Sequence, residues 1–342
     1  MERKKFVGFG ELLLRLAPDG YLRFPQAERF NLNYTGAEGN MAVTLAYMGM
    51  PAELVTKLPD HEIGRCAQRT LAKYGVQTGH IAYGGERLGV YYLERGASQR
   101  PSKIIYDRKH SSFAEAESGE YDWDEIFQDA GWFHFTGITA ALSDKTAAAC
   151  REACAAAKRH GVRVSCDLNY RKSLWTTERA QAVMRPLMEY VDVLIANEED
   201  SEKVLGVSAA RTDVIAGKLD VEGYRELAEK LTESYGFQAV AITLRESISA
   251  SVNNWSALLY TGGRAYHSRK YTMQIVNRVG GGDSFASGLI YAMLWDFDPQ
   301  KTVEFAAGAS CLKHSIEFDF NLSTPEEVYQ LIQGDGSGRV VR

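Results

Sequence analysis

Several features that mark other classes of protein are absent from this 342-residue sequence. It has only five cysteines, an odd and scattered set that argues against a disulfide framework. It contains no apolar run of about 18 residues, so no membrane span is expected. The start of the chain is basic, but the apolar stretch that follows it is broken by Glu11 and Arg15, and no small-residue cleavage site follows. A signal peptide is therefore not predicted, and the expected compartment is cytoplasmic.

Charge and histidine spacing argue against two more classes. The formal net charge is -5, and no basic run is long enough to indicate a nucleic-acid-binding stripe. The seven histidines form no H-x-x-H or H-E-x-x-H grouping, so no structural zinc site is implied. A mildly acidic protein that binds an anion must concentrate positive charge locally, so individual Arg and Lys residues become candidates for such a site.

Short apolar runs alternate with longer helical stretches along most of the chain. Runs such as Ala52–Leu58 predict buried strands, and stretches such as Asp144–His160, which is followed by Gly161, predict helices. This alternation is typical of parallel β-α-β units, in which ligands bind beyond the carboxyl ends of the strands. The other predicted elements are strands at 6–16, 132–136, 162–168, 191–196 and 239–244 and helices at 40–48, 62–74, 224–235, 284–295 and 302–314.

Two segments, 12–34 and 87–113, interrupt this alternation. Both contain strand-like runs and turn signals, so together they are expected to form a small sheet. That sheet would project from a core made of residues 1–11, 35–86 and 114–342. A lid over an active site and a plain pair of surface hairpins are both consistent with the pattern. A surface loop is also predicted over 208–223 and a frayed tail over 334–342.

The strongest functional signal is a glycine run followed by an acid, Gly280-Gly281-Gly282-Asp283. Glycine permits backbone conformations in which successive N–H groups point at one anion, and the positive end of the following helix adds to the same spot. A carboxylate beside such a cradle is placed to accept the proton of an attacking hydroxyl. An Asp at a helix start is also a favoured N-cap, but a cap needs no row of glycines.

This block, residues 276–288, resembles the second signature of the ribokinase/PfkB-like carbohydrate kinases, roughly D-T-x-G-A-G-D. The resemblance implies that Asp283 is the catalytic base and that the glycines form an anion hole. Asn277 and Arg278 stand where the family has Asp and Thr. Residues 36–42 resemble the family's first signature, G-G-x-x-x-N-x-A, although an Asn capping a helix is the simpler alternative there. The implied fold is α/β, a ribokinase-like three-layer α-β-α sandwich with a mostly parallel central sheet and a small β lid.

Three further segments resemble one branch of this family, the 2-keto-3-deoxygluconate kinases. Residues 106–108 resemble its Tyr-x-Arg, residues 167–175 its D-x-N-Y-R-x-x-L-W, and residues 318–321 its G-D-F-N with Phe318 in place of Gly. A keto acid sugar carries a carboxylate, which a planar guanidinium grips with two hydrogen bonds. Arg108 and Arg171 are the candidates for this grip. The alternative for both is an ordinary surface arginine, and Arg171 could also face the ATP phosphates. The implied substrate-binding set is Gly36, Asn40, Tyr91, Tyr106, Arg108, Arg171, Asp283 and Asp319.

Two segments that follow other strands resemble the family's nucleotide site. Residues 197–200 resemble N-x-x-E, which organises Mg²⁺ through water, so Glu198 and Asp200 are candidates; acids at a helix start also stabilise the helix dipole. Residues 243–249 correspond to a loop along ATP that usually reads K-x-G-x-x-G, and here both glycines are absent. The implied ATP-binding set is Asn169, Arg171, Asn197, Thr243, Arg245, Ser249, Gly280, Gly282 and Ser310.

The resemblance implies an ATP- and Mg²⁺-dependent kinase that converts 2-keto-3-deoxygluconate to its 6-phosphate. A kinase for fructose, ribose or a similar sugar and a sugar-binding protein with impaired kinase activity are the alternatives. A nicotinamide-dependent oxidoreductase is less consistent with the sequence, because no early G-x-G-x-x-G links a strand to a helix. The expected partners are a sugar acid and ATP, with no nucleic acid and no membrane. A homodimer formed through the lid is also expected.

Overall fold

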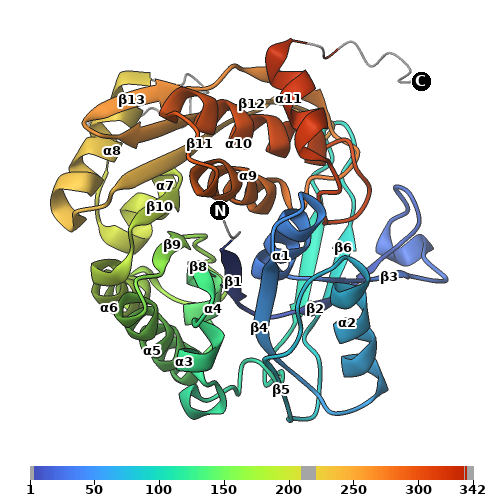
Figure 1. Cartoon of the computed structure of the whole chain (residues 1–342). Helices are drawn as coiled ribbons and strands as arrows, with labels where there is room; N and C mark the ends of the chain where they lie inside the picture. The colour runs from blue at the N-terminus through green and yellow to red at the C-terminus, as the bar shows by residue number, and fades with distance from the viewer. Residues whose placement is uncertain (1–3, 209–220, 335, 337–342) are drawn as a thin grey trace.

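One large sheet forms the frame of the molecule (Figure 1). The computed structural model describes residues 4–208, 221–334 and 336. The strands lie in the order β13-β12-β11-β10-β9-β8-β1-β4-β5, and β14 pairs with β12. Neighbours from β11 to β5 run parallel, whereas β12 is antiparallel to its partners. The bounds are β1 Lys5–Phe9, β4 Ala52–Leu58, β5 Ile81–Tyr83, β8 Ala130–Thr136, β9 Arg163–Asp167, β10 Val193–Ala196, β11 Ala239–Ser247, β12 Val252–Thr261, β13 Arg264–His267 and β14 Tyr271–Gln274.

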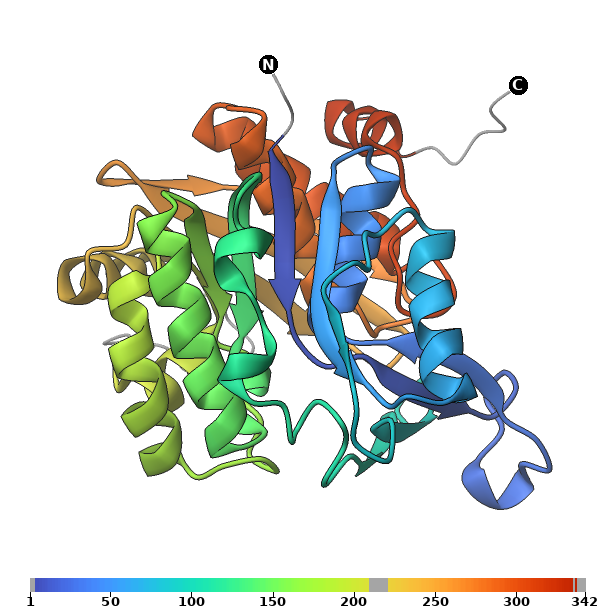
Figure 2. The same cartoon turned by 60° about the horizontal axis from the view of Figure 1, so that its bottom comes forward.

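Helices cover both faces of this sheet and complete three layers (Figures 1 and 2). Successive side chains of a strand point to opposite faces, so Val7 packs into one core and Phe6 into the other. The first core is closed by α3 Trp123–Ile126, α4 Gly137–Ala141, α5 Asp144–Arg159, α6 Thr177–Leu187 and α8 Val221–Tyr235. The second is closed by α1 Ala37–Tyr47, α2 Glu62–Lys73, α9 Gly281–Leu294, α10 Pro299–Lys313 and α11 Pro325–Gln333.

The helix ends follow from local chemistry. The Ser143 hydroxyl accepts a hydrogen bond from the Thr146 N–H and caps α5, and Gly161, with φ +66°, lets the chain turn back into β9. Helix α10 begins at Pro299, earlier than predicted, because Asp298 caps it and proline suits a first helical position. Within the described residues, no helix combines the length and the apolar character that crossing a membrane requires.

Helices α1 and α9 also begin earlier than the sequence predicts, and this changes the setting of two candidate residues. Asn40 lies inside α1 and does not cap it, since the capping residue is Gly36. Asp283 likewise lies in the first turn of α9, whose cap is Gly280. The predictions were wrong here because glycine has a low helix propensity, whereas packing of the apolar residues that follow decides the helix.

Two predicted strands differ from the observed ones. The predicted strand at 6–16 is divided into β1 and β2, because Gly10 and Glu11 carry the chain out of the large sheet. The segment 243–249, expected as a loop, is mostly strand, since β11 continues to Ser247 in a hairpin with β12. The predicted loop at 208–223 lies outside the described residues except for Ser208 and the start of α8. The predicted tail lies outside them except for Gly334 and Gly336.

A second, smaller sheet projects from one side of the large one (Figure 2). Its order is β3-β2-β6-β7, with β2 parallel to β6 and the other pairs antiparallel. The bounds are β2 Leu13–Ala17, β3 Asn31–Thr35, β6 Val90–Glu94 and β7 Lys103–Asp107. This small sheet is the lid of a ribokinase-like fold, and the predicted fold class is confirmed.

A buried polar cluster ties the lid to the core. Arg15 on β2 forms an ion pair with Asp319, which follows α10, and both side chains are almost completely buried. The Tyr91 hydroxyl on β6 donates to the same carboxylate at 2.7 Å. At the lid edge, Arg95 pairs with Glu317 at 2.8 Å. Breaking a buried ion pair leaves an uncompensated charge and is costly, so these contacts hold the lid in one position relative to the loop after α10.

Candidate active site

A cavity of about 670 Å³ opens at the carboxyl ends of β9, β10 and β11. The first turns of α1 and α9 close it on one side, and the lid residues Tyr91, Tyr106 and Arg108 line it on another. In a parallel sheet the carboxyl ends of neighbouring strands meet at one edge, so polar residues distant in sequence come together there. Of the sequence-predicted site residues, the cavity is lined by Gly36, Asn40, Tyr91, Tyr106, Arg108, Asn169, Arg171, Asn197, Glu198, Asp200, Thr243, Arg245, Gly280, Gly281, Gly282 and Asp283.

The glycine turn is built so that two of its positions admit no side chain. Gly280 has φ +84°, and a Cβ there would collide with the carbonyl oxygen of Asp319. A Cβ on Gly281 would collide with the ring of His314, whereas Gly282 has open space beside it. The turn therefore presents bare backbone to the cavity at the positive end of α9, which is the arrangement that binds an anion.

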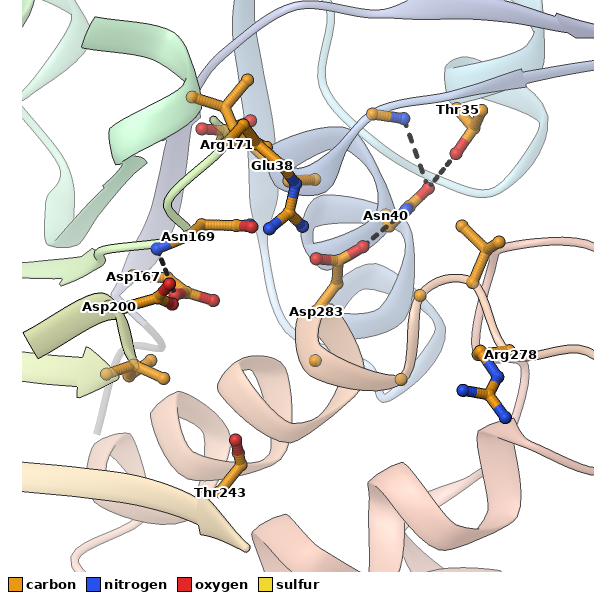
Figure 3. Close-up of a pocket in the computed structure, with 18 of the residues that line it drawn as sticks. Thr35, Glu38, Asn40, Asp167, Asn169, Arg171, Asp200, Thr243, Arg278 and Asp283 are labelled. Atoms are coloured by element: carbon orange, nitrogen blue, oxygen red, sulfur yellow. Dashed lines mark hydrogen bonds between the residues drawn. The ribbon is translucent and has the colours of Figure 1, made fainter. Parts of the chain in front are cut away.

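Asp283 lies beside this turn and is held by α1 (Figure 3). Asn40 Nδ2 donates to Asp283 Oδ2 at 2.7 Å, and Thr35 Oγ1 donates to Asn40 Oδ1 at 2.8 Å, which fixes the orientation of the amide. Burial raises the pKa of Asp283 to about 6; the Asn40 hydrogen bond opposes this, and the charge of Glu38 adds to it. A carboxylate with this pKa is ionised at neutral pH and is a stronger base than an exposed one.

The lid arginine and tyrosines form one wall of the cavity. Arg108 donates from Nε to Glu11 at 2.8 Å and also from Nη2 to the same carboxylate, so its Nη1 edge is the part that can meet a ligand. Its guanidinium lies 5.6 Å from the centre of the Tyr106 ring, which in turn lies 5.7 Å from that of Tyr91. Asp319 does not line the cavity, because its carboxylate is buried against Arg15 and Tyr91.

Arg171 approaches Asp283 from the opposite wall (Figure 3). It donates to the carbonyl of Tyr170 at 3.0 Å and is in no ion pair among the described residues. Its positive charge is one of the influences that lower the pKa of Asp283 and Asp200. From the sequence, Arg171 was a candidate to bind either the sugar acid or the ATP phosphates. Its position near Asp283 is compatible with both interpretations.

Two carboxylates lie behind Arg171. Burial raises the pKa of Asp167 to about 8, and the charges of Asp200 and Asp283 add to the effect. Burial likewise raises the pKa of Asp200 to about 7. Backbone N–H groups hold both, from Asn169 to Asp167 at 3.1 Å and from Tyr170 to Asp200 at 3.2 Å. Two neighbouring acids that resist ionisation in the free protein favour a cation between them.

The fit to Mg²⁺ can be judged from these donors. Among the described residues, no three or more Asp, Glu, His or Cys side chains form a cage for a metal. Asp200 is also engaged by Asn197, whose Nδ2 donates to it at 2.9 Å. Mg²⁺ keeps several waters and takes its remaining ligands from phosphates, so Asp167 and Asp200 suit it as partners contacted through water.

The other nucleotide candidates are divided between the cavity and the core. Thr243 and Arg245 line the cavity from β11, while Ser249 lies beyond it at the hairpin tip and accepts a hydrogen bond from the backbone N–H of Val252 at 3.0 Å. Ser310 is buried and outside the cavity, and its hydroxyl donates to the carbonyl of Gly281 at 2.7 Å. Ser310 therefore supports the glycine turn from behind.

The whole chain is similar to known carbohydrate kinases. Residues 4–315 match the model of the pfkB family carbohydrate kinases. The chain belongs to this family. A crystal structure of 2-dehydro-3-deoxygluconokinase from Thermotoga maritima is 52% identical with a TM-score of 0.94, covering 97% of this chain and 100% of that one. The family excludes the nicotinamide-dependent alternative and confirms the predicted class, a phosphotransferase with an alcohol acceptor.

Two other known proteins are also similar to this chain. The 2-dehydro-3-deoxygalactonokinase of Haloferax volcanii is 30% identical over 98% of both chains. A ribokinase-type structure from Escherichia coli, 19% identical with a TM-score of 0.79 over 96% of this chain and 99% of that one, was solved in complex with ATP and Mg²⁺. At that identity the likeness shows a shared fold.

The structure adds residues that the sequence reasoning did not assign to the site of this kinase. Glu38 is buried near Asp283 and accepts from the Thr136 N–H at 2.9 Å and the Thr139 hydroxyl at 2.8 Å. Arg278 lines the cavity, and its Nη2 donates to the carbonyl of Ser249 at 3.2 Å. Glu38 stands inside the first signature and could have been noticed there. Other additions that line the cavity include Glu11, Thr35, Asp167, Trp255 and His314.

The glycine turn yields a matched pair of variants. Gly280→Ala is expected to lower the free energy of unfolding by about 1–3 kcal/mol, because it places a Cβ against the Asp319 carbonyl at positive φ. Gly282→Ala has room for its Cβ and is expected to change the unfolding free energy by less than about 0.5 kcal/mol. Urea titrations of both variants provide the measurement, and equal losses would contradict this packing.

Proposed function

We propose that this kinase phosphorylates 2-keto-3-deoxygluconate, or its C4 epimer, at the terminal hydroxyl with ATP as donor. The observation that carries the proposal is the Asp283 carboxylate, held by Asn40 next to the bare glycine turn in a cavity that also contains Arg108 and Arg171. A base, an anion cradle and guanidinium groups in one cavity match the needs of phosphoryl transfer to an acid sugar.

In this proposal the turn and the acid divide the chemistry. Asp283 accepts the proton of the sugar hydroxyl as that oxygen attacks the γ-phosphoryl group. The backbone N–H groups of Gly280 to Gly282 and the positive end of α9 hold the charge that develops on the phosphoryl oxygens. Asp167, Asp200 and neighbouring Glu198 would hold Mg²⁺ through water, and the ion would supply charge neutralisation of the phosphates.

The sugar acid would lie between the lid and the end of β9. Arg108 presents Nη1 and Arg171 most of its guanidinium, while Tyr106, a partly exposed residue, adds a ring and a hydroxyl. A carboxylate gripped by guanidinium groups fixes the far end of the sugar, so that the terminal hydroxyl reaches Asp283. Asp319 contributes through Arg15 and Tyr91, by keeping the lid wall in place.

Asp283→Asn is expected to lower kcat by about 10²–10⁴-fold, because the amide cannot accept the proton. In the unaltered kinase kcat/KM should fall below a pH of about 6, where Asp283 becomes protonated. The raised pKa means that the folded protein disfavours the charged carboxylate, which is the form present at pH 8. The neutral Asn variant should therefore melt at a temperature no lower than that of the parent at this pH. Asn40→Ala removes the hydrogen bond that opposes the shift, and it should move the acid limb to higher pH. Near-normal turnover in the Asn variant would reject Asp283 as the base.

Arg108→Ala and Arg171→Ala test the sugar acid. Each is expected to weaken kcat/KM for 2-keto-3-deoxygluconate by at least about tenfold more than for fructose or ribose, since a neutral sugar has no carboxylate to lose. The measurement is a coupled ADP-release assay over a panel that includes the gluco and galacto epimers. Arg29→Ala, which alters an exposed lid pair with Asp19, is the control. Equal losses on acid and neutral sugars would remove the carboxylate argument and favour a ketokinase or ribokinase reaction.

The outer face of the lid supports the homodimer that the family resemblance implies. Leu32, Leu16, Tyr92 and Ile105 are register partners across the four strands and therefore form one apolar row. Leu32 and Ile105 at its ends are more than half exposed. An apolar sheet face of this kind is covered most simply by the same face of a second copy, about a twofold axis.

Sedimentation velocity tests this assembly. The parent should sediment as a dimer of the 38.0 kDa chain, and a Leu32→Asp/Ile105→Asp variant as a monomer. Ile63→Asp, on an exposed site of α2, is the matched control and should stay dimeric. A monomeric parent, or a variant that remains dimeric, would rule out pairing through the lid.

A further inference from the structure

Lys313 is a buried cation that the proposed mechanism does not use. It is the last residue of α10, and none of its surface is exposed. Its Nζ donates to the carbonyl of Ile316 at 3.3 Å, and no carboxylate of the described residues lies within 4 Å of it. A buried ammonium with one weak partner is costly, so its retention requires an explanation.

The position of Lys313 explains why a buried lysine is retained there, because the C-terminal turn of α10 packs beneath the glycine turn. A Cβ on Gly280 would lie 3.2 Å from Lys313 Cε. Ser310 donates to the Gly281 carbonyl, and the backbone N–H of Val276 donates to the His314 carbonyl at 2.8 Å. Lys313 does not line the cavity, so it lies on the far side of the turn from the ligands.

The surroundings of Lys313 leave its charge only partly compensated. Burial lowers its pKa to about 8; the carboxylates of Asp319, Asp283 and Glu317 oppose the change, and the charge of Arg15 adds to it. Asp319 is already paired with Arg15. A polyanion bound on the other side of Gly280 would therefore meet a positive charge through protein of low dielectric, where Coulomb interactions are strong.

We infer that Lys313 is a positioning residue for phosphoryl transfer, a fixed cation beneath the glycine turn that stabilises the anion held above it. This inference rests on the proposed function and adds a residue to it. Lys313 acts through the turn and through its charge, without contact to the phosphate. The N–H groups of the turn supply hydrogen bonds, and Lys313 supplies a full positive charge that they lack.

Two consequences separate this role from a purely structural one. Loss of the proton from Lys313 should reduce activity, so kcat/KM should decline as the pH rises above about 8. A bound nucleotide should favour the protonated form, so the corresponding decline in kcat should lie at higher pH. The nucleotide should also draw a proton from solution as it binds near pH 8.5.

Lys313→Met removes the charge while nearly preserving the shape of the side chain. We expect kcat to fall by about tenfold or more, with the KM for the sugar changed less than about twofold, and the alkaline decline in kcat/KM to disappear. Lys301→Met makes the same change at an exposed position of the same helix, outside the cavity, and should leave all three unchanged. A folded Lys313→Met kinase with unaltered kcat and an unaltered alkaline limb would overturn the inference.

A second measurement does not depend on any variant folding. The Mg²⁺ complex of AMP-PNP is titrated into the parent kinase at pH 8.5 by calorimetry in two buffers of different ionisation enthalpy. Uptake of a fraction of a proton on binding supports the role of Lys313, and binding without uptake contradicts it. If the parent kinase phosphorylates no sugar of the panel, the proposed function fails. If the parent is active and Lys313→Met is equally active, only the role of Lys313 fails.

Discussion

The active site depends on the packing of Gly280 against the carbonyl of Asp319. This contact leaves no room for a side chain, turns the chain at positive φ, and starts α9 at the next residue. The turn of backbone N–H groups, the orientation of Asp283 and the contact between Asp283 and Asn40 all follow from that start. Because α1 and α9 pack side by side, a base from one end of the chain and its hydrogen-bond donor from the other meet in the cavity.

Charge in the site is arranged in two groups, carboxylates and cations, around the proposed path of the phosphate. Three carboxylates whose pKa burial raises, Asp167, Asp200 and Asp283, line the cavity, where the proposed mechanism has the cation and the hydroxyl proton. Positive groups lie around the glycine turn, with Arg245 and Arg278 at the cavity wall and Lys313 beneath it. Each set is poorly compensated alone, so under the proposed function the binding of nucleotide and cation would relieve an electrostatic cost built into the free protein.

Asp319 links this turn to the lid. Its carbonyl defines the shape at Gly280, while its carboxylate holds Arg15 and Tyr91 on two lid strands. The lid wall that carries Tyr106 and Arg108 is thereby positioned by the same residue that shapes the anion cradle. A sequence motif read one residue at a time assigns such an acid to the ligand, whereas the structure places it inside the junction between lid and core.

The sequence by itself indicated the alternation of strands and helices and the glycine–Asp283 pair, because periodicity, capping and glycine chemistry are local, and its resemblance to the ribokinase/PfkB-like kinases implied the fold class. It did not predict β5, α6, β12, β13 or α11. It misplaced the starts of α1 and α9 and read 243–249 as a loop, since helix packing and hairpin pairing are long-range contacts that outweigh local propensity. Only the tertiary structure decided that Asp319 and Ser310 support the site from behind and that Lys313 lies beneath the turn. Contacts between residues distant in sequence produce no periodic pattern in either segment, so sequence patterns do not predict them.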